Sequence, residues 1–414
     1  MAAPGRIDTG GDPELAHQLA DALREGRDRE VNESLTHPLH TYPARMHPGT
    51  ARRLIDVVME GRPYGTLIDP FCGSGTTLVE ARAAGARAIG VDLNPLAVTL
   101  ARAKTWTAPL PRRRALRDVG QRIAGEVLAE GKQARRSGHE PAPLRAPAGF
   151  DPNARNRRLA RWFAPHVRRE LELIATHIED VRADDPEIAE ALTAALSAIL
   201  YKVSSRASDT DPTWVERHVA RGAAARLFAQ RVELLFAGLD EMTRVRGETP
   251  QVIEADARTL VDRLGAGAAA GVVTSPPYAG TYDYAEQHRL RFDFLGIRHR
   301  AFDEGEIGAR RSFDGDDRRG PRPDPRHQWR QDLAAVVDMI GGLLVPGGRA
   351  ALVIGDSIAG GRAMYADDDV RGTLGDDLAL AAWASQTRPT LGAGERRAFG
   401  ERPKREHVIL LVRR

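Results

Sequence analysis

The sequence predicts an α/β protein in which a mostly parallel β-sheet has helices on both faces and is interrupted by a helical insertion. The first observation is that strand and helix patterns alternate in GTLIDPFCGSGTTLVEARAAGARAIGVDLNPLAVTLARA, residues 65–103. The second is that strand patterns return late in the chain, in VIEAD, GVVTS, RAALVIGDS and HVILLVRR. The third is the helical periodicity of the segment between these blocks, as in HVRRELELIATHIEDV. Short apolar strands that alternate with helices are typical of parallel sheets.

These patterns divide the chain into four segments. Residues 1–34 are predicted to form a polar N-terminal leader with one short helix, DPELAHQLADALREG. Residues 35–109 form the first α/β block, residues 110–247 the helical insertion, and residues 248–414 the second α/β block. Within the last block, residues 299–328 are charged and rich in Gly and Pro, so we expect a mobile loop there.

The composition fits a soluble globular protein that is larger than one ordinary core. The chain has 414 residues, of which 42% are hydrophobic and 28% charged. Lys and Arg total 60 against 57 Asp and Glu, so any basic surface for a polyanionic partner has to be local. The single cysteine, Cys72, excludes internal disulfides and a multi-cysteine zinc site, and we expect no metal site. The sequence shows neither a membrane-spanning run nor a signal peptide, which predicts a cytoplasmic protein without a membrane partner.

A Gly-rich turn after the first strand is a candidate ligand site. Gly73 and Gly75 permit a tight turn and close approach of a ligand to the backbone. The dinucleotide pattern G-x-G-x-x-G is incomplete, because Leu78 holds the third glycine's place, and a P-loop lysine is also missing. Asp92 ends the next strand and could accept both hydroxyls of a ribose, and Asp256 ends a third strand and could hold an adenine amino group. A plain βα turn is the alternative, but the two acids favour a cofactor that contains a nucleoside.

A second candidate site is the turn in GVVTSPPYAG, residues 271–280. Prolines fix φ and lack the backbone N–H, so this turn is rigid and leaves carbonyl groups unpaired. Tyr278 adds a flat aromatic face beside these acceptors. A rigid turn with free acceptors and a ring at the end of a buried strand is a plausible active site.

DPFCGSGTT, VDLNP and TSPPY together resemble the amino DNA methyltransferases that use S-adenosylmethionine, in which the target is N4 of cytosine or N6 of adenine. The resemblance covers the two α/β blocks. It implies a Rossmann-like methyltransferase fold with a mostly parallel seven-stranded sheet, S-adenosylmethionine as cofactor and double-stranded DNA as substrate. A cognate restriction or defence system is an implied partner. The first block would bind the cofactor, the second would contain the catalytic turn, and the insertion is a possible DNA-recognition region.

The resemblance also implies individual site residues. THPLHTYPARMHP is similar to the family's extra cofactor segment, and the Asp of the Gly-rich loop, here Asp69, binds the amino group of the methionine part. The catalytic tetrapeptide is Ser275, Pro276, Pro277 and Tyr278. The candidate cofactor-binding residues are Tyr42, Pro43, Ala44, Arg45, Asp69, Phe71, Gly73, Gly75, Thr76, Asp92, Asn94 and Asp256.

The chemistry of an exocyclic amine explains why such a turn is useful. The amine is a poor nucleophile because its lone pair is delocalised into the ring. Ser275 Oγ and the Pro276 carbonyl can accept its protons and free the lone pair, and Tyr278 can stack on a flipped base. Ser-Pro-Pro-Tyr in this family goes mostly with cytosine N4. The alternatives are an adenine-N6 DNA methyltransferase, an RNA base methyltransferase, and an inactive nucleic-acid-binding subunit.

Nucleic-acid contacts are predicted in two places. Lys202, Ser205 and Arg206 form a cluster of cations and hydroxyls suited to phosphate, and Trp214 and Arg217 could reach a base or sugar. The alternative is that this run caps and joins helices. The insertion falls earlier in the chain than the family's usual recognition domain, which leaves its role open.

The second place follows the catalytic turn. Tyr282 could form a wall of the base pocket and Arg289 could contact nucleic acid, but the segment could equally begin a core helix. The Arg-rich stretch 310–330 could close over a duplex or be an inert loop. Asp356 could face a ligand or only cap the next turn.

Overall fold

The computed structural model describes residues 5–26, 29–137, 152–245, 247–313 and 324–414. Its main feature is an eight-stranded sheet with the strand order β1-β9-β10-β6-β5-β2-β3-β4. The last five strands in this order pair in parallel, and the first three are antiparallel. The strands are β1 Ile7–Gly11, β2 Thr66–Asp69, β3 Arg87–Asp92, β4 Gln251–Glu254, β5 Ala269–Thr274, β6 Leu344–Gly355, β9 Leu378–Thr387 and β10 Arg405–Arg413.

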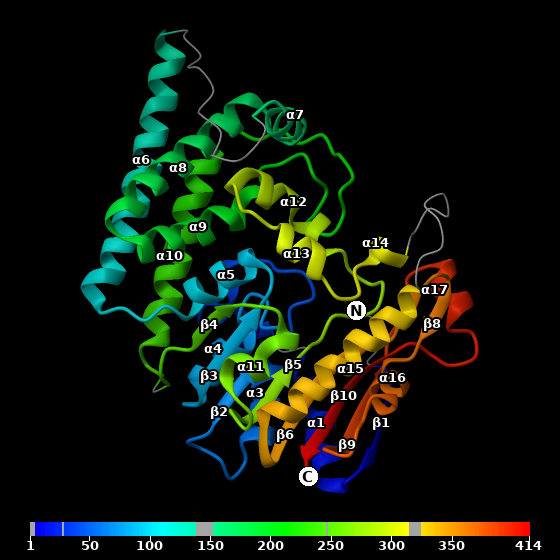
Figure 1. Cartoon of the computed structure of the whole chain (residues 1–414). Helices are drawn as coiled ribbons and strands as arrows, with labels where there is room; N and C mark the ends of the chain where they lie inside the picture. The colour runs from blue at the N-terminus through cyan, green and yellow to red at the C-terminus, as the bar shows by residue number, and fades with distance from the viewer. Residues whose placement is uncertain (1–4, 27–28, 138–151, 246, 314–323) are drawn as a thin grey trace.

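Helices cover both faces of this sheet, as the sequence predicts. Along β5 and β6 successive side chains point to opposite faces, so Val273 and Val353 join one apolar core while Val272 and Leu352 join another. The first core is closed by α1 Pro13–Glu25, α3 Pro48–Met59, α4 Thr76–Ala83 and part of α5 Pro95–Thr105. The second is closed by α11 Leu260–Leu264, α15 Pro325–Leu343 and α16 Ala366–Gly372 (Figure 1).

The predicted insertion is helical in its described residues. Its helices are α6 Leu110–Ser137, α7 Pro152–Trp162, α8 Pro165–Asp184, α9 Pro186–Leu200 and α10 Ala223–Met242. Their apolar faces form a third core, which also includes Leu96 and Leu100 of α5 and Phe292 of α12 Tyr284–Leu295. The insertion therefore packs directly on the sheet domain beside the carboxyl ends of the parallel strands (Figure 1).

The short helix predicted within the N-terminal leader, residues 1–34, forms as α1, whereas the strand β1 in the same segment was not expected. β1 pairs with β9, so the sheet has eight strands where seven were expected. The helix α1 buries Leu19 and Leu23 on one face, which packs against β9 and α3. The leucine spacing was visible in the sequence, but the strand was not, because IDTGG has few strand-forming residues and depends on the free edge of β9. The helix α2 Arg29–Glu33 and the 3-10 turn η1 His37–Leu39 follow.

The expectation of a mobile loop at residues 299–328 is also corrected where the structure describes it. Residues 300–313 contain two short helices, α13 Arg300–Gly305 and α14 Arg310–Phe313, because Phe302 and Ile307 are buried. Residues 314–323, which include part of the stretch predicted to close over a duplex, lie outside the described residues. The remaining elements are η2 Ala257–Thr259, β7 Ser357–Ala359, β8 Arg362–Met364 and α17 Ala393–Ala398. Among the described helices, none is both long and apolar enough to cross a membrane.

Candidate active site

A cavity with an empty volume of about 1000 Å³, part of it open to solvent, lies at the carboxyl ends of the parallel strands. This is where ligands gather in open α/β sheets, because the loops after successive strands meet at that edge. The cavity brings together segments that are far apart in the sequence. Its walls come from residues 42–46, 69–74, 76–77, 92–94, 256–257, 275–278, 282, 284, 302 and 305–307.

Asp69, at the end of β2, is the most deeply placed acid of the cavity. Its side chain is 3% exposed, and Thr274 Oγ1 and the Phe71 backbone N–H donate hydrogen bonds of 2.7 and 3.1 Å to Oδ1. Burial raises the pKa of Asp69 to about 6, since these hydrogen bonds only partly replace water. A cationic group entering the cavity would stabilise the ionised carboxylate.

The Gly-rich turn and the end of β3 are held together by Asp92. The Gly73 backbone N–H donates to Asp92 Oδ2 at 2.9 Å and the Asn94 N–H to Oδ1 at 2.8 Å, and burial raises the pKa of this carboxyl to about 6. Gly73 has a φ of +50°, and a Cβ there would lie 3.4 Å from the Tyr42 ring. Gly75 has a φ of +82° and packs on α5, so it shapes the turn without lining the cavity.

The segment with Tyr42, Pro43, Ala44 and Arg45 forms the opposite wall. Tyr42 accepts a 3.2 Å hydrogen bond on its hydroxyl from Asn94 Nδ2, and burial raises its pKa, which keeps it protonated. Arg45 Nη1 donates to the His37 carbonyl at 2.8 Å. These contacts tie the segment to η1 on one side and to the start of α5 on the other.

Asp256 lines the cavity but is already paired. Arg258 forms a 2.6 Å ion pair with it and also donates its backbone N–H, and a second 2.6 Å bond links Arg258 to Asp332. Burial would raise the pKa of Asp256, but the Arg258 hydrogen bonds outweigh this effect and the pKa is lowered. Sequence reasoning missed Arg258, although its spacing of two residues from an N-capping Asp was a usable signal.

The Ser275–Tyr278 turn leaves β5 and forms the floor of the cavity beside Asp69. Trp329 Nε1 donates to the Pro277 carbonyl at 3.1 Å, whereas no hydrogen bond reaches the Pro276 carbonyl from the described residues. Ser275 Oγ lies 3.5 Å from the Tyr278 hydroxyl. The Pro276 carbonyl therefore remains an available acceptor, and Trp329, which the sequence did not single out, braces the turn.

Gly355, at the end of β6, supports the Tyr278 ring. A Cβ on this glycine would lie 2.9 Å from Tyr278 Cε2, closer than such contacts occur, so only glycine permits this ring position. Tyr282 extends the aromatic wall, with its ring centroid 6.5 Å from that of Tyr278 and 5.4 Å from that of Tyr284.

The other residues predicted to contact nucleic acid do not line the cavity. Arg206 is 2% exposed, donates to the Ser208 carbonyl and lies over the Tyr201 ring, so the predicted phosphate contact is wrong for this conformation. Arg217 likewise donates to main-chain carbonyls, those of Tyr201 and Lys202, whereas Lys202 and Trp214 are exposed.

The two remaining residues predicted to contact nucleic acid, Ser205 and Arg289, also have partners within the protein. Ser205 bonds through its backbone to Trp162 and Val215. Arg289 is half-exposed, with its guanidinium 3.8 Å from Glu286 and 3.9 Å from Asp303. The alternative that residues 201–217 join helices accounts for these contacts better than phosphate binding does.

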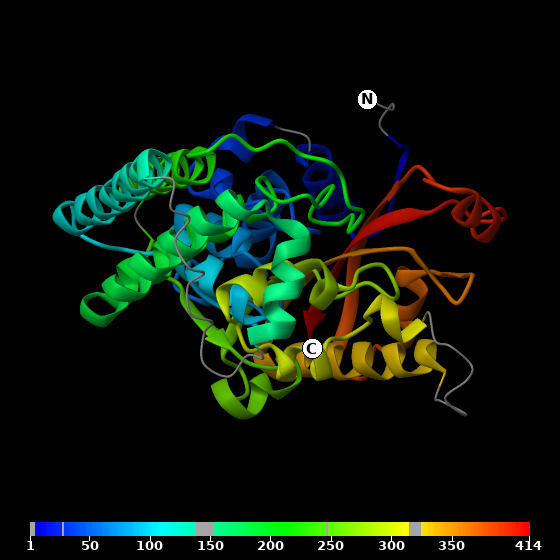
Figure 2. The same ribbon diagram turned by 90° about the horizontal axis from the view of Figure 1, so that it is seen from above.

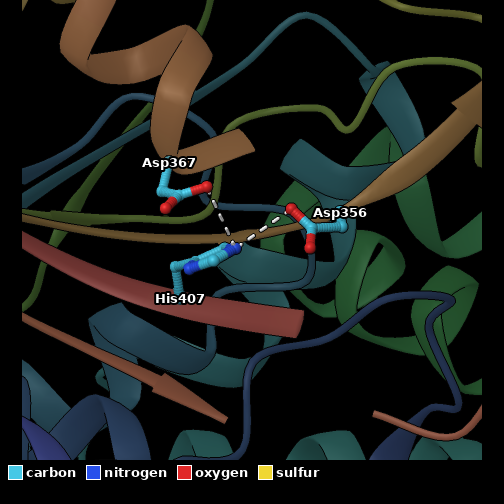
Figure 3. A group of neighbouring side chains, drawn as sticks. All are labelled: Asp356, Asp367 and His407. Carbon is cyan, nitrogen blue, oxygen red and sulfur yellow. Dashed lines mark hydrogen bonds and ion pairs between the residues drawn. The ribbon is translucent and has the colours of Figure 1, made fainter. Parts of the chain in front are cut away.

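Asp356 lies outside the cavity, in a buried cluster with Asp367 and His407 (Figure 3). Its Oδ1 accepts the N–H of Ala366, the first residue of α16, at 3.0 Å, and His407 Nε2 lies 3.0 Å from the same oxygen. Asp356 therefore accepts from the start of α16, ten residues further along the chain, and does not cap the turn directly after it. Cys72 lines the cavity but is buried, which raises its thiol pKa and keeps it a small apolar group.

The parallel strand order β4-β3-β2-β5-β6, continued by antiparallel β10 and β9 and with a cavity at the carboxyl ends, defines a Rossmann-like methyltransferase fold. A family described as DNA methylase, with N6 and N4 amino targets, matches residues 22–103. Over these residues the chain is similar to the N4/N6 amino DNA methyltransferase family.

Two curated relatives are similar to this chain. Type II methyltransferase M.MvaI of Kocuria varians is 33% identical over 155 residues, which cover 37% of this chain and 31% of that protein. Type II methyltransferase M.MjaII of Methanocaldococcus jannaschii is 21% identical over 350 residues, covering 66% of this chain and 64% of that protein. The chain thus spans less than two thirds of the length of either relative.

Among solved structures, the rRNA methyltransferase aviRa of Streptomyces viridochromogenes aligns with 94% of this chain and 93% of its own, at 14% identity and a TM-score of 0.33. TrmN of Thermus thermophilus aligns with 89% of this chain and 49% of its own, at 12% identity and a TM-score of 0.32. Similarity this low supports no conclusion about substrate.

Proposed function

We propose that the protein transfers a methyl group from S-adenosylmethionine to an exocyclic amine of a base in double-stranded DNA, and that the atom is N4 of cytosine. The observation that supports this most is that Asp69 and the Ser275–Tyr278 turn open into one cavity. A cofactor bound by the first and a base held by the second would be close enough for direct transfer.

The polar groups of the cavity suit this cofactor. Asp69 is a buried carboxylate that has no cationic partner among the described residues, which suits the ammonium of the methionine part. The hydroxyl oxygens of Ser74 and Thr76 are buried without a hydrogen-bond partner in the described part of the chain, and both residues line the cavity. Asp92 would accept the ribose hydroxyls and Asp256, with Arg258, would lie at the adenine. The cofactor supplies an activated methyl group on a sulfonium.

The chain's own residues position the base and its amine. Ser275 Oγ and the free Pro276 carbonyl would accept the two amine protons, so that the nitrogen lone pair is available for attack. The two prolines and the Trp329 bond hold these acceptors in place, and little rearrangement is needed at the transition state. Tyr278 would stack on the flipped base, with Tyr282 as a side wall.

Expression in a host without its own DNA methylation tests this proposal. The host DNA is sequenced with a modification-sensitive method, and we expect N4-methylcytosine in one short sequence context. A Ser275→Ala variant is the matched control, since it removes one acceptor of the turn and leaves Asp69 in place; it should bind the cofactor normally and leave much less methylation. Methylated adenine in place of methylated cytosine would show that the target atom is N6 of adenine. DNA without any modification, from cells with folded protein, would refute the proposal.

A further inference from the structure

The connection between β9 and β10, residues 388–404, forms an arm beside the catalytic turn; we call it the C-terminal arm. β10 is antiparallel to β6, so this connection lies at the same edge as the carboxyl ends of the parallel strands. Glu406 pairs with Gly355, the residue beneath the Tyr278 ring. The arm, with α17 (red, at the right in both views), lies on the opposite side of this edge from the helices of the insertion (Figures 1 and 2).

The C-terminal arm is basic and ends in an exposed apolar tip. It has five basic residues, Arg388, Arg396, Arg397, Arg402 and Lys404, against two acidic ones, Glu395 and Glu401. Three of the five form ion pairs: Arg388 with Glu406, Arg402 with Asp367, and Lys404 with Glu395.

The other two, Arg396 and Arg397, are exposed on α17 and have no ion pair with any described residue. Leu391 at the tip is 86% exposed, so it contributes nothing to the core. Three of the five basic side chains are therefore used in ion pairs within the protein. Arg396, Arg397 and Leu391 instead face solvent.

Buried contacts hold the arm in one position. Phe399 is buried, with its ring edge-on to Tyr365 at 6.0 Å, and the Arg402 guanidinium lies 4.4 Å over the same ring. An arm that is already ordered loses little conformational entropy when it binds a partner.

At the base of the arm, His407 Nε2 lies 3.0 Å from Asp356 (Figure 3), and His407 Nδ1 lies 2.7 Å from Ser385 Oγ. Asp356, Asp367 and His407 have a spacing that a metal ion could use. However, Asp367 already binds Arg402 through both oxygens, and the Arg405 backbone N–H donates to Asp356 Oδ2 at 2.9 Å. These carboxylates are therefore paired within the protein, and the cluster fixes the root of the C-terminal arm.

We propose that the C-terminal arm is a second contact surface for duplex DNA, in which Arg396 and Arg397 bind backbone phosphates while the helical insertion lies on the other side of the duplex. This rests on the proposed function, because the duplex has to lie across the cavity mouth for a base to reach the Ser275–Tyr278 turn. Two unpaired guanidinium groups complement a polyanion and release its counterions on binding. Leu391 would lie against the sugar edge of a groove.

The test measures binding of the full chain to a mixed-sequence duplex DNA fragment at several salt concentrations. The double variant Arg396→Gln/Arg397→Gln should bind more weakly. The plot of log K against log salt should also become less steep by about 2, since each phosphate contact contributes ~0.9 to the slope. The variant Arg396→Lys/Arg397→Lys keeps the charge and should keep the slope. The matched control Arg244→Gln/Arg263→Gln removes two exposed arginines from the segments that lead into β4 and β5, at the opposite edge of the sheet, and should leave the slope unchanged.

Each outcome separates the two proposals. If Arg396→Gln/Arg397→Gln has the slope of the unaltered protein, and the unaltered protein methylates DNA, then the proposal for the C-terminal arm is refuted and the proposed function is not. An equal loss of slope in the opposite-edge control also refutes it, because the effect would then be one of net charge. Unaltered protein that neither binds duplex DNA nor methylates it refutes both the arm and the proposed function. Thermal unfolding of each variant checks that the fold is intact.

Discussion

Replacing Asp69 by Asn should make the cofactor-free protein more stable at neutral pH while it abolishes cofactor binding. Burial raises the pKa of Asp69 from 3.8 to about 6, so the fold disfavours the ionised carboxylate. A shift of roughly 2 units corresponds to about 3 kcal/mol, at ~1.4 kcal/mol per unit. The penalty is absent below the unfolded pKa near 4 and is complete above about 6, because only there is the buried group ionised.

Asparagine can keep the local hydrogen bonds. Thr274 Oγ1 and the Phe71 N–H both donate to a single oxygen of Asp69, which the asparagine carbonyl replaces. The Thr77 hydroxyl, which bonds to the carboxylate, can accept from the asparagine amide. The free energy of unfolding of Asp69→Asn should therefore exceed that of the unaltered protein by about 2–3 kcal/mol at pH 8, with the difference shrinking toward pH 5.

The assay is urea unfolding between pH 5 and 8, with and without S-adenosylmethionine. The cofactor should raise the stability of the unaltered protein and leave Asp69→Asn unchanged. If Asp69→Asn is the less stable protein at pH 8 without cofactor, then the carboxylate contributes net stability and the reasoning from its burial is wrong. If the cofactor stabilises both proteins equally, Asp69 does not bind it.

Two more predictions concern the catalytic turn, and a third concerns the cluster at the root of the C-terminal arm. Pro276→Ala should lower the methyl-transfer rate at least tenfold with unchanged cofactor affinity, since it loosens the acceptor geometry; equal rates would contradict the preorganised turn. Gly355→Ala should displace the Tyr278 ring and lower the rate of transfer, whereas Gly372→Ala, with open space around it, should not; steady-state kinetics on DNA measure both. Asp356→Ala should cost about 2–4 kcal/mol in urea unfolding, because two backbone N–H groups and His407 lose a buried acceptor, and a loss below about 0.5 kcal/mol would contradict the idea that the Asp356–Asp367–His407 cluster fixes the root of the C-terminal arm.

Much of the sheet and of the cavity could be predicted because the signals are local. Val272 and Val273 lie in an apolar run that suits a strand buried on both faces, and β5 forms there. Asp69 and Asp92 each end a parallel strand, and all such strands end at one edge, so strand assignment alone brought them together. Nothing local marked IDTGG as a strand, because its pairing depends on β9, which lies more than 360 residues further along the chain.

The amino-acid sequence by itself determined the fold class and the two motifs of the cavity, since both depend on residues within a few positions of one another. Tertiary structure decided which side chains are free to act. Arg206 has the sequence context of a phosphate ligand, but it is buried against Tyr201 and Ser208. Arg396 and Arg397 belong to a connection that the pairing of β10 with β6 places at the same edge of the sheet as the Ser275–Tyr278 turn. Exposure and ion pairing are set by distant segments packing together, and spacing along the chain does not encode them.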